Sequence, residues 1–190
     1  MKIFIDIETG GFSIEKNGIC EIAFVITDDD LNFITEYQTY IKPYKRPDST
    51  EFVSYKPEAM EVNKIPMCII LNGKDVTVVL REIQDLILST IFQNQTDLLF
   101  ESQNTFIGHN SISFDIPRIK YLFKRFLPDF NVDLFGQEDT KVIARKKLNL
   151  ESYSLENLCT HFGIENQNAH SALSDVYATI ELYKKLQLIG

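Results

Sequence analysis

The stretch KIFIDIETGG occupies residues 2–11 and has the pattern of a β-strand that ends in two glycines. Isoleucine stands at residues 3, 5 and 7, whereas phenylalanine and two acidic residues alternate with it. Side chains two positions apart on a strand lie on one face, so we expect Asp6 and Glu8 to project together near its carboxyl end. Two carboxylates about 4 Å apart repel by roughly 4 kcal/mol at an effective dielectric constant of about 20. The pair therefore requires a proton or a cation, unless it stands at a solvated strand end.

Two further β-rich runs, 19–27 and 33–41, follow this strand. Their short connections predict hairpins, so we expect the chain to open with a three-stranded meander. Helical spacing of apolar residues predicts helices farther along, and short apolar runs predict two more strands. The expected helices are 58–63, 75–91, 116–126, 139–147, 154–163 and 173–183, and the expected strands are 105–108 and 132–135. This order predicts an α/β fold, with a mixed five-stranded sheet flanked by helices.

The segment 42–57 separates the meander from the first expected helix. It holds three prolines among polar residues, which predicts a long loop. We expect this loop to be the part of the chain best suited to act as a mobile flap.

The composition predicts one compact domain over residues 1–190. Of the 190 residues, 44% are hydrophobic, which is enough to bury a core without a disulfide or a structural metal. The three cysteines are widely spaced and form no CxxC pair, which argues against a disulfide framework and a zinc site. Asp6 and Glu8 stand where a signal peptide needs an apolar segment, so we expect a cytoplasmic protein without a membrane partner.

The charge balance disfavours nucleic acid as a partner when it is taken as a whole. The chain has 19 basic and 27 acidic residues, for a formal net charge of −8. Between Arg118 and Lys147, however, basic residues outnumber acidic ones. This run is either a solvated helical face or a surface that meets phosphates. Acidic residues gathered around cations would reconcile the negative total with a phosphate-containing substrate.

Two more groups of polar residues stand where α/β folds deliver functional side chains. His109 and Asn110 follow an apolar run, and Asp115 opens the next helix, where it either caps that helix or binds a ligand. His170 precedes Asp175 by five residues, a spacing expected by chance only roughly 0.2 times in this chain. Within a regular helix the two side chains would lie about 140° apart, so they share a cleft only if His170 precedes the helix. A structural histidine is the alternative.

Together these groups resemble the motifs of the DnaQ-like (DEDDh) 3′–5′ exonucleases, the superfamily of polymerase proofreading domains, RNase T and oligoribonuclease. The three motifs are Asp-Ile-Glu-Thr at 6–9, His-Asn-x-x-x-Phe-Asp at 109–115 and His-x-x-x-x-Asp at 170–175. Asp139-Thr140 and the run 153–164 agree as secondary markers. Ser171 separates the chain from the sister group that has tyrosine there. Gly10 stands where proofreading members usually have threonine, which leaves the preferred nucleic acid open.

The resemblance implies a ribonuclease H-like fold and two Mg²⁺ or Mn²⁺ ions held by Asp6, Glu8, Asp115 and Asp175. Carboxylates supply only oxygen ligands, which suit these hard cations and not zinc. Two such ions roughly 3.5 to 4 Å apart activate a water and stabilise the leaving oxygen in phosphodiester hydrolysis. By resemblance, Asp6 bridges both ions, Glu8 and Asp175 hold the ion that binds the attacking water, and Asp115 steadies the other. His170 would be the general base, because an imidazole can take a proton near neutral pH.

The resemblance also implies contacts to the substrate. Glu8 and the Thr9 backbone would meet the terminal 3′ hydroxyl. Phe12 either stacks on the last base, a contact worth about 1 to 3 kcal/mol, or packs within its own loop. Asn110 either binds substrate or, with His109, orients the second motif. Phe114 is expected in the core.

We therefore expect a metal-dependent 3′–5′ exonuclease that acts on single-stranded nucleic acid, with DNA favoured, and releases nucleoside monophosphates. The alternatives are an RNA-trimming or oligoribonucleotide-degrading enzyme and a catalytically silent nucleic-acid-binding subunit. The basic helix 141–147 is a candidate rail for the substrate backbone. Gln95-x-x-Leu98-x-Phe100 loosely resembles a sliding-clamp-binding peptide, the only sign of a clamp or polymerase partner. His161 lies outside every motif and receives no function.

Overall fold

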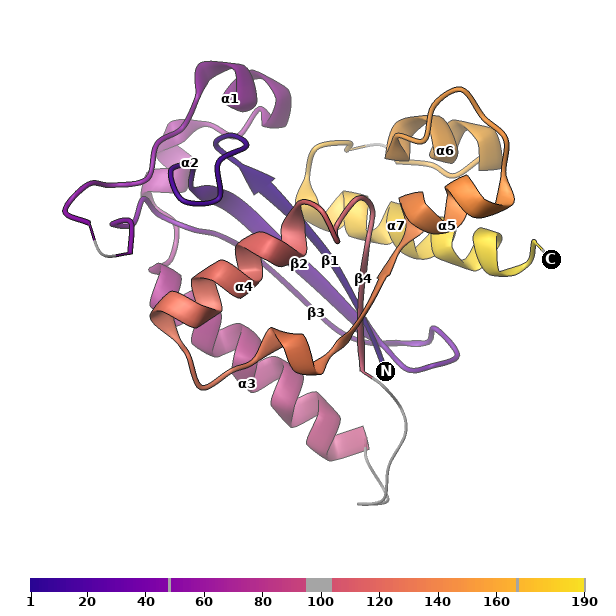
Figure 1. Cartoon of the computed structure of the whole chain (residues 1–190), viewed down its shortest axis with the longest axis horizontal. Helices are drawn as coiled ribbons and strands as arrows, with labels where there is room; N and C mark the ends of the chain where they lie inside the picture. The colour runs from indigo at the N-terminus through magenta and orange to yellow at the C-terminus, as the bar shows by residue number, and fades with distance from the viewer. Residues whose placement is uncertain (48, 95–103, 167, 190) are drawn as a thin grey trace.

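The computed structural model describes residues 1–47, 49–94, 104–166 and 168–189 and has a mixed five-stranded sheet (Figure 1). The strands are β1 (Lys2–Thr9), β2 (Ile19–Thr27), β3 (Phe33–Tyr40), β4 (Thr105–Gly108) and β5 (Gly136–Asp139). Their order in the sheet is β3-β2-β1-β4-β5. The first three strands form the predicted antiparallel meander, and β4 and β5 continue the sheet in parallel with β1. The predicted fold class is confirmed.

Seven α-helices are described around this sheet. They are α1 (Pro57–Asn63), α2 (Met67–Leu71), α3 (Val76–Asn94), α4 (Asp115–Phe126), α5 (Thr140–Lys147), α6 (Leu155–Phe162) and α7 (Ala172–Gln187). All six predicted helices are confirmed. The five-residue helix α2 was not predicted, because so short an element shows no helical period.

The predicted strand at 132–135 is wrong. Val132–Leu134 forms a 3₁₀ turn, and the strand begins two residues later at Gly136, which pairs with Thr105. The Asn131 side chain accepts a hydrogen bond from the Asp133 backbone N–H at 3.0 Å, which turns the chain before it can enter the sheet. The apolar signal came from Val132, which packs in the core beside the sheet.

The two faces of the sheet bury different helices, as the alternation in β1 requires (Figure 1). Ile3, Ile5 and Ile7 pack in a core shared with α3 and α4. Phe4 points to the opposite face and meets Tyr183 of α7 edge to face at 5.6 Å between ring centroids. Since side chains alternate, Asp6 and Glu8 continue the face that α7 covers.

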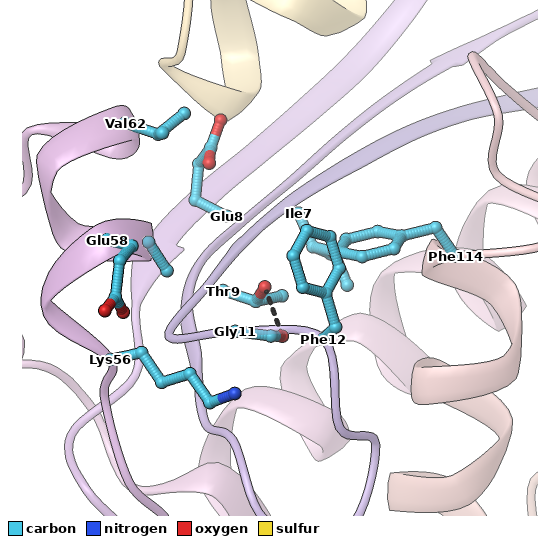
Figure 2. A pocket seen from close by; sticks show the side chains of 10 residues that line it. Ile7, Glu8, Thr9, Gly11, Phe12, Lys56, Glu58, Val62 and Phe114 are labelled. Atoms are coloured by element: carbon cyan, nitrogen blue, oxygen red, sulfur yellow. Dashed lines mark hydrogen bonds between the residues drawn. The ribbon is translucent and has the colours of Figure 1, made fainter.

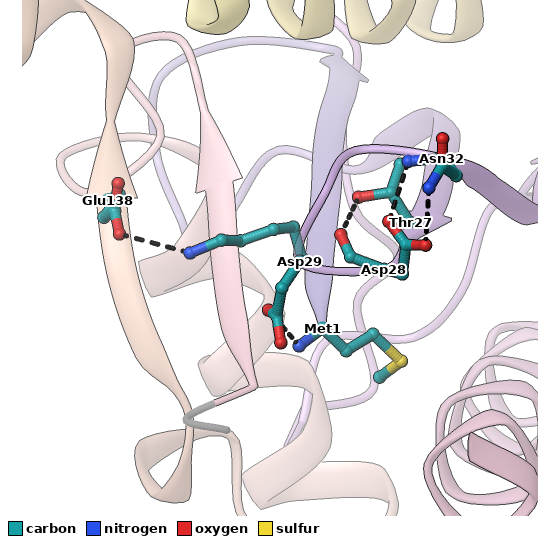
Figure 3. A network of polar contacts seen from close by, with 7 residues as sticks. Met1, Thr27, Asp28, Asp29, Asn32 and Glu138 are labelled. Carbon is teal, nitrogen blue, oxygen red and sulfur yellow. Dashed lines mark hydrogen bonds and ion pairs between the residues drawn. The ribbon is translucent and has the colours of Figure 1, made fainter. Parts of the chain in front are cut away.

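Polar contacts anchor the beginning of β1, at the end of the strand away from the two acids (Figure 3). The amino group of Met1 lies 2.7 Å from an Asp29 carboxylate oxygen, and the Lys2 ammonium lies 3.7 Å from Glu138 of β5. The Asp28 carboxylate accepts the Asn32 backbone N–H at 2.8 Å and closes the β2–β3 hairpin. These contacts anchor the end of the β1–β2 pair at which β1 begins and β2 ends.

Residues 42–56 form the predicted long loop, which is packed against the end of β1. Backbone N–H groups of Gly18, Ser54 and Lys56 donate to the carbonyl oxygens of Ser54, Lys16 and Gly10, at 3.2, 2.8 and 2.8 Å. A Cβ at Gly10 would lie 2.6 Å from the ring of Tyr55, so the approach of the two segments requires glycine there. The segment therefore forms a wall beside the strand end.

In the described parts of the chain, no helix is both long and apolar enough to cross a membrane. The predicted clamp-binding peptide at 95–100 lies outside the described residues.

Candidate active site

The third motif meets the first at the carboxyl end of β1. Ligand atoms of Glu8, His170 and Asp175 all lie within 4.8 Å of one another. Ser171 is the N-cap of α7, so His170 precedes the helix and Asp175 stands in its first turn. His170 has a left-handed backbone with φ of 70°, and its N–H donates to Asp175 at 3.1 Å. This turn brings the two side chains into one cleft, which a continuous helix would not do.

Asp115 reaches β1 from α4, which covers the face of the sheet opposite to α7. It is the first residue of α4, is 3% exposed, and accepts the Ile7 backbone N–H at 3.0 Å. Within the described residues, β1 pairs with β4 as far as Phe4, and the Ile7 N–H has no strand partner on that edge. The Asp115 carboxylate fills this role from the first turn of α4. Asp115 of the second motif is therefore bonded to the backbone of Ile7, the residue between Asp6 and Glu8 of the first motif.

Burial raises the pKa values of these carboxyl groups, and their mutual repulsion adds to the effect. The pKa of Glu8 rises to about 8, first because of burial and then because Asp175, Glu21 and Asp115 repel its charge. The pKa of Asp6 is raised well above its usual range by burial and by the charges of Asp115 and Glu8. Burial also raises the pKa values of Asp115 and Asp175. The cluster is thus unfavourable as a set of bare anions, and a divalent cation fits it.

This repulsion predicts how the stability of the metal-free protein depends on pH. Because the pKa of Glu8 in the folded state is about 8 against 4.5 in the unfolded chain, the folded state keeps a proton that the unfolded chain releases. Stability therefore falls as pH rises, by up to about 1.4 kcal/mol per pH unit for each such group. Burial lowers the pKa of His109 to about 4 in the folded state, against 6.5 in the unfolded chain. Below pH 6.5 this histidine therefore makes stability rise with pH, which opposes the effect of Glu8. The window in which the fall in stability is expected is pH 6.5 to 8.

Thermal melting in a chelator across this window tests the prediction. We expect the melting temperature to fall between pH 6.5 and 8, the fall to be smaller in Glu8→Gln, and Mn²⁺ to remove most of it. Glu61→Gln, which changes an exposed acid on α1, is the matched control and should keep the full slope. A melting temperature that rises with pH in the wild-type protein would refute the assignment.

A cavity of about 450 Å³ opens beside the carboxylates (Figure 2). Glu8 and Thr9 line it at the strand end, and the rings of Phe12 and Phe114 stand together on one side. The other side is lined by Lys56 and by Glu58, Ala59 and Val62 of α1. Phe12 is 84% exposed, whereas Phe114 both packs against the core and lines the cavity. The expectation that Phe114 is only a core residue is therefore incomplete.

Comparison with known proteins agrees with these motifs. The sequence profile of the RNase T family, described as exonuclease, matches residues 3–183. The chain belongs to the RNase T exonuclease family. All three motifs and all of the sheet except Lys2 lie within the matched segment.

Relatives of this exonuclease-family chain include enzymes named for DNA and for RNA. It is 25% identical over 200 residues to Exodeoxyribonuclease I of Buchnera aphidicola, covering 96% of this chain and 45% of the relative. It is 24% identical over 194 residues to Oligoribonuclease of Francisella tularensis, covering 94% of this chain and 89% of the relative. The chain thus spans less than half of the first relative and most of the second.

A zinc-bound complex of E. coli Exonuclease I with single-stranded DNA has a similar fold. The TM-score is 0.74 at 24% identity, covering 96% of this chain and 39% of that one. The sheet with its flanking helices is therefore a ribonuclease H-like fold, as expected. The family depends on divalent metal ions.

A buried network around Asp139 supports the second motif of this exonuclease-family chain. Asp139 caps α5 and also accepts the backbone N–H groups of Asn110 and Ile112 at 3.0 and 3.2 Å. The ring nitrogens of His109 lie 2.9 Å from the Thr140 hydroxyl and 3.0 Å from the Tyr153 carbonyl. Burial lowers the pKa of His109 to about 4, so its ring is neutral at physiological pH. His109 thus links β4 to the start of α5, as its predicted orienting role requires.

The Asn110 side chain faces neighbouring side chains of the protein. Its oxygen lies 3.3 Å from the Lys141 ammonium and 3.1 Å from the Ser113 hydroxyl, and both groups donate to it. Asn110 also has a left-handed backbone with φ of 63°. These contacts favour the orienting role for Asn110 over a direct contact to substrate.

The basic helix α5 offers less to a substrate than its sequence predicts. The Lys147 ammonium donates to carbonyl oxygens at the end of the chain, including Leu186 at 3.0 Å. The Arg145 guanidinium lies 5.7 Å from the centroid of the Tyr153 ring. Lys141 lies beside Asn110. Only part of the predicted rail is therefore free to meet phosphates.

Glu21 is a buried acid that the motif analysis missed. It stands directly opposite Glu8 in the β1–β2 register and is 1% exposed. Its carboxylate accepts the Ala172 backbone N–H at the start of α7, at 3.2 Å, and the side-chain amide of Gln38. The single acid in the otherwise apolar run 19–27 was the sequence signal that could have found it.

Proposed function

We propose that this chain is a metal-dependent 3′–5′ exonuclease that removes nucleoside monophosphates from single-stranded nucleic acid, with DNA favoured. One observation carries the proposal: carboxylates from three distant motifs gather at the end of β1, where Glu8 and Asp175 lie close to His170 and Asp115 binds the Ile7 backbone, beside a cavity of about 450 Å³. The family resemblance of the motifs and the exonuclease profile support it.

Four carboxylates would hold the divalent cations in this proposal: Asp6, Glu8, Asp115 and Asp175. The repulsion among these buried groups, seen in their raised pKa values, is the reason that the residues fit such ions. All four ligands are oxygens, a set that favours Mg²⁺ or Mn²⁺. When bound, the ions supply charge that lowers the pKa of water and stabilises the leaving oxygen.

His170 would act as the general base. Its side chain is exposed, while its ring lies beside the carboxylates of Glu8 and Asp175. A ring nitrogen accepts the proton of the attacking water and can return it to solvent, because the histidine stands at the mouth of the site. The water oxygen forms a bond to phosphorus, the bond to the 3′ oxygen of the preceding nucleotide breaks, and that oxygen takes up a proton.

The cavity walls would hold the terminal nucleotide. Glu8 and Thr9 line its inner end, where the terminal 3′ hydroxyl would lie. Phe12 stands at the mouth with an exposed ring, which suits stacking on the last base.

Phe12→Ala tests the contact to the terminal base. We expect KM for an oligonucleotide to rise about 10-fold, since stacking on one base contributes about 1 to 3 kcal/mol, while kcat stays within twofold. Steady-state kinetics on a single-stranded oligonucleotide measure both values. Phe52→Ala, which removes another exposed ring, is the matched control. An unchanged KM in Phe12→Ala would assign this ring to packing.

A time course on matched DNA and RNA oligonucleotides labelled at the 5′ end tests the proposed function. With Mg²⁺ or Mn²⁺ we expect a one-nucleotide ladder that shortens from the 3′ end and is missing in Asp6→Asn. The faster ladder identifies the preferred polymer. Zinc is a third arm, because a similar fold has been solved with that ion.

The alternative substrate is a short oligoribonucleotide. The match to Oligoribonuclease over 89% of that relative's length favours this candidate. It predicts that RNA dinucleotides are degraded at least as fast as longer chains, which a length series from two to twelve nucleotides measures. If wild type and Asp6→Asn are equally inert on both polymers and Mn²⁺ does not shift the melting temperature, a silent binding subunit is the better description.

A further inference from the structure

A buried arginine connects the helix of the second motif to the loop of Phe12. Arg118 lies on α4, three residues after Asp115, and is 4% exposed. One terminal nitrogen donates to the Phe114 carbonyl at 2.9 Å. The other donates to the carbonyl oxygens of Gly11, at 3.3 Å, and of Phe12. Among the described residues its Nε has no hydrogen-bond partner, so the terminal nitrogens set the orientation of the guanidinium.

The same guanidinium is stacked on the aromatic wall of the cavity. Its central carbon lies 3.8 Å from the centroid of the Phe114 ring. Phe114 in turn meets Phe12 edge to face, with 6.2 Å between the centroids. Arg118 therefore contacts both the backbone of the loop and the ring against which Phe12 rests.

A second polar contact to the Gly11 carbonyl comes from within the loop and does not reach α4. The Gly11 carbonyl also accepts the Thr9 hydroxyl at 3.0 Å, a bond within the same turn. Gly11 has a φ of 145°, a conformation that residues with a side chain rarely adopt. In this conformation the Gly11 carbonyl oxygen accepts from Arg118. The exposed Phe12 ring gains little from burial, so its position depends on how its backbone is held.

We propose that Arg118 is a positioning residue that holds the Gly11–Phe12 turn, and thereby presents the Phe12 ring to the terminal base of the substrate. Arginine suits this role because its planar fork directs several N–H donors at fixed angles, whereas lysine offers a single rotating ammonium. Arg118 would thus couple the position of the Phe12 ring to that of α4, the helix that carries Asp115. This inference rests on the proposed function for its substrate, but not for the anchoring of the loop.

Hydrogen exchange without nucleic acid tests the anchoring alone. In Arg118→Met we expect the backbone amides of residues 12–17 to exchange at least about 10-fold faster than in the wild type. Lys124→Met removes an exposed cation from the same helix and is expected to leave this exchange unchanged. Unaltered exchange in a folded Arg118→Met protein overturns the proposal, whatever the activity of the chain.

Kinetics test whether the anchoring acts through Phe12. We expect KM to rise about 10-fold in Arg118→Met with kcat within twofold, and the double variant with Phe12→Ala to match Phe12→Ala alone. If the effects of Arg118→Met and Phe12→Ala on KM are additive in the double variant, the proposal is overturned. A loss in Arg118→Met that is confined to kcat also overturns it, because that loss would place the effect at Asp115. Arg118→Lys keeps the charge and stem, so an intermediate KM is expected, and it replaces Arg118→Met if that protein does not fold. An inactive wild-type protein refutes the nuclease function, while the exchange experiment still decides the anchoring.

Discussion

Asp6→Asn is expected to lower phosphodiester hydrolysis at least about 1,000-fold. Burial and the charges of Asp115, Glu8, Asp175 and Glu21 all raise the pKa of Asp6, so its carboxylate requires a compensating cation. A divalent cation at this cluster contributes several kcal/mol of charge stabilisation, and each 1.4 kcal/mol corresponds to about tenfold in rate. Asparagine keeps the shape of the side chain and removes the charge. Single-turnover rates on a 5′-labelled oligonucleotide at saturating Mg²⁺ measure the loss.

The same substitution should separate a metal ligand from a structural acid. Specific binding to the folded state at 100 times the dissociation constant adds about 2.7 kcal/mol, so Mn²⁺ should raise the melting temperature of the wild type. In Asp6→Asn this increase should be lost, while the metal-free protein becomes more stable because one source of repulsion is gone. Asp129→Asn changes an exposed acid after α4 and is the matched control. A full Mn²⁺ response in Asp6→Asn would contradict the assignment.

His170→Ala is expected to lower turnover about 1,000-fold and to leave cation binding in place. General acid–base catalysis contributes about 10²- to 10⁴-fold, and the His170 ring is close to Glu8 and Asp175 while remaining open to solvent. The carboxylates stay in the variant, so the Mn²⁺ increase in melting temperature should persist. Single-turnover rates and melting curves on the same preparation measure both properties.

His161→Ala provides the control for this prediction. It removes an exposed histidine at the end of α6 that lies outside all three motifs, and its turnover should stay within twofold of the wild type. A rate in His170→Ala within tenfold of the wild type would remove this residue from the role of base. Loss of the Mn²⁺ response would instead make it a ligand of the cation.

Patterns within a few residues account for much of this fold, whereas contacts between distant segments account for the rest. The meander, every described helix except α2, and the end of α6 at Gly163 follow from periodicity, capping and turn chemistry within a few residues. The strand expected at 132–135 failed because Val132 is apolar for reasons of core packing, while the true strand β5 carries Gln137 and Glu138. The loop expected before the first helix is present, but its composition gave no sign of the hydrogen bonds to a distant turn that hold it against the end of β1.

By itself the sequence determined the fold class, the common face of Asp6 and Glu8, and the identity of the three motifs. Periods of two and 3.6 residues fix which side chains share a face, and motif spacing carries the chemistry. Only the tertiary structure decided that Glu21 faces Glu8 and holds the start of α7, and that Arg118 holds a turn more than a hundred residues before it. The physical reason is that a buried charge is stable only with partners, and partners brought together by folding have no signature in local sequence.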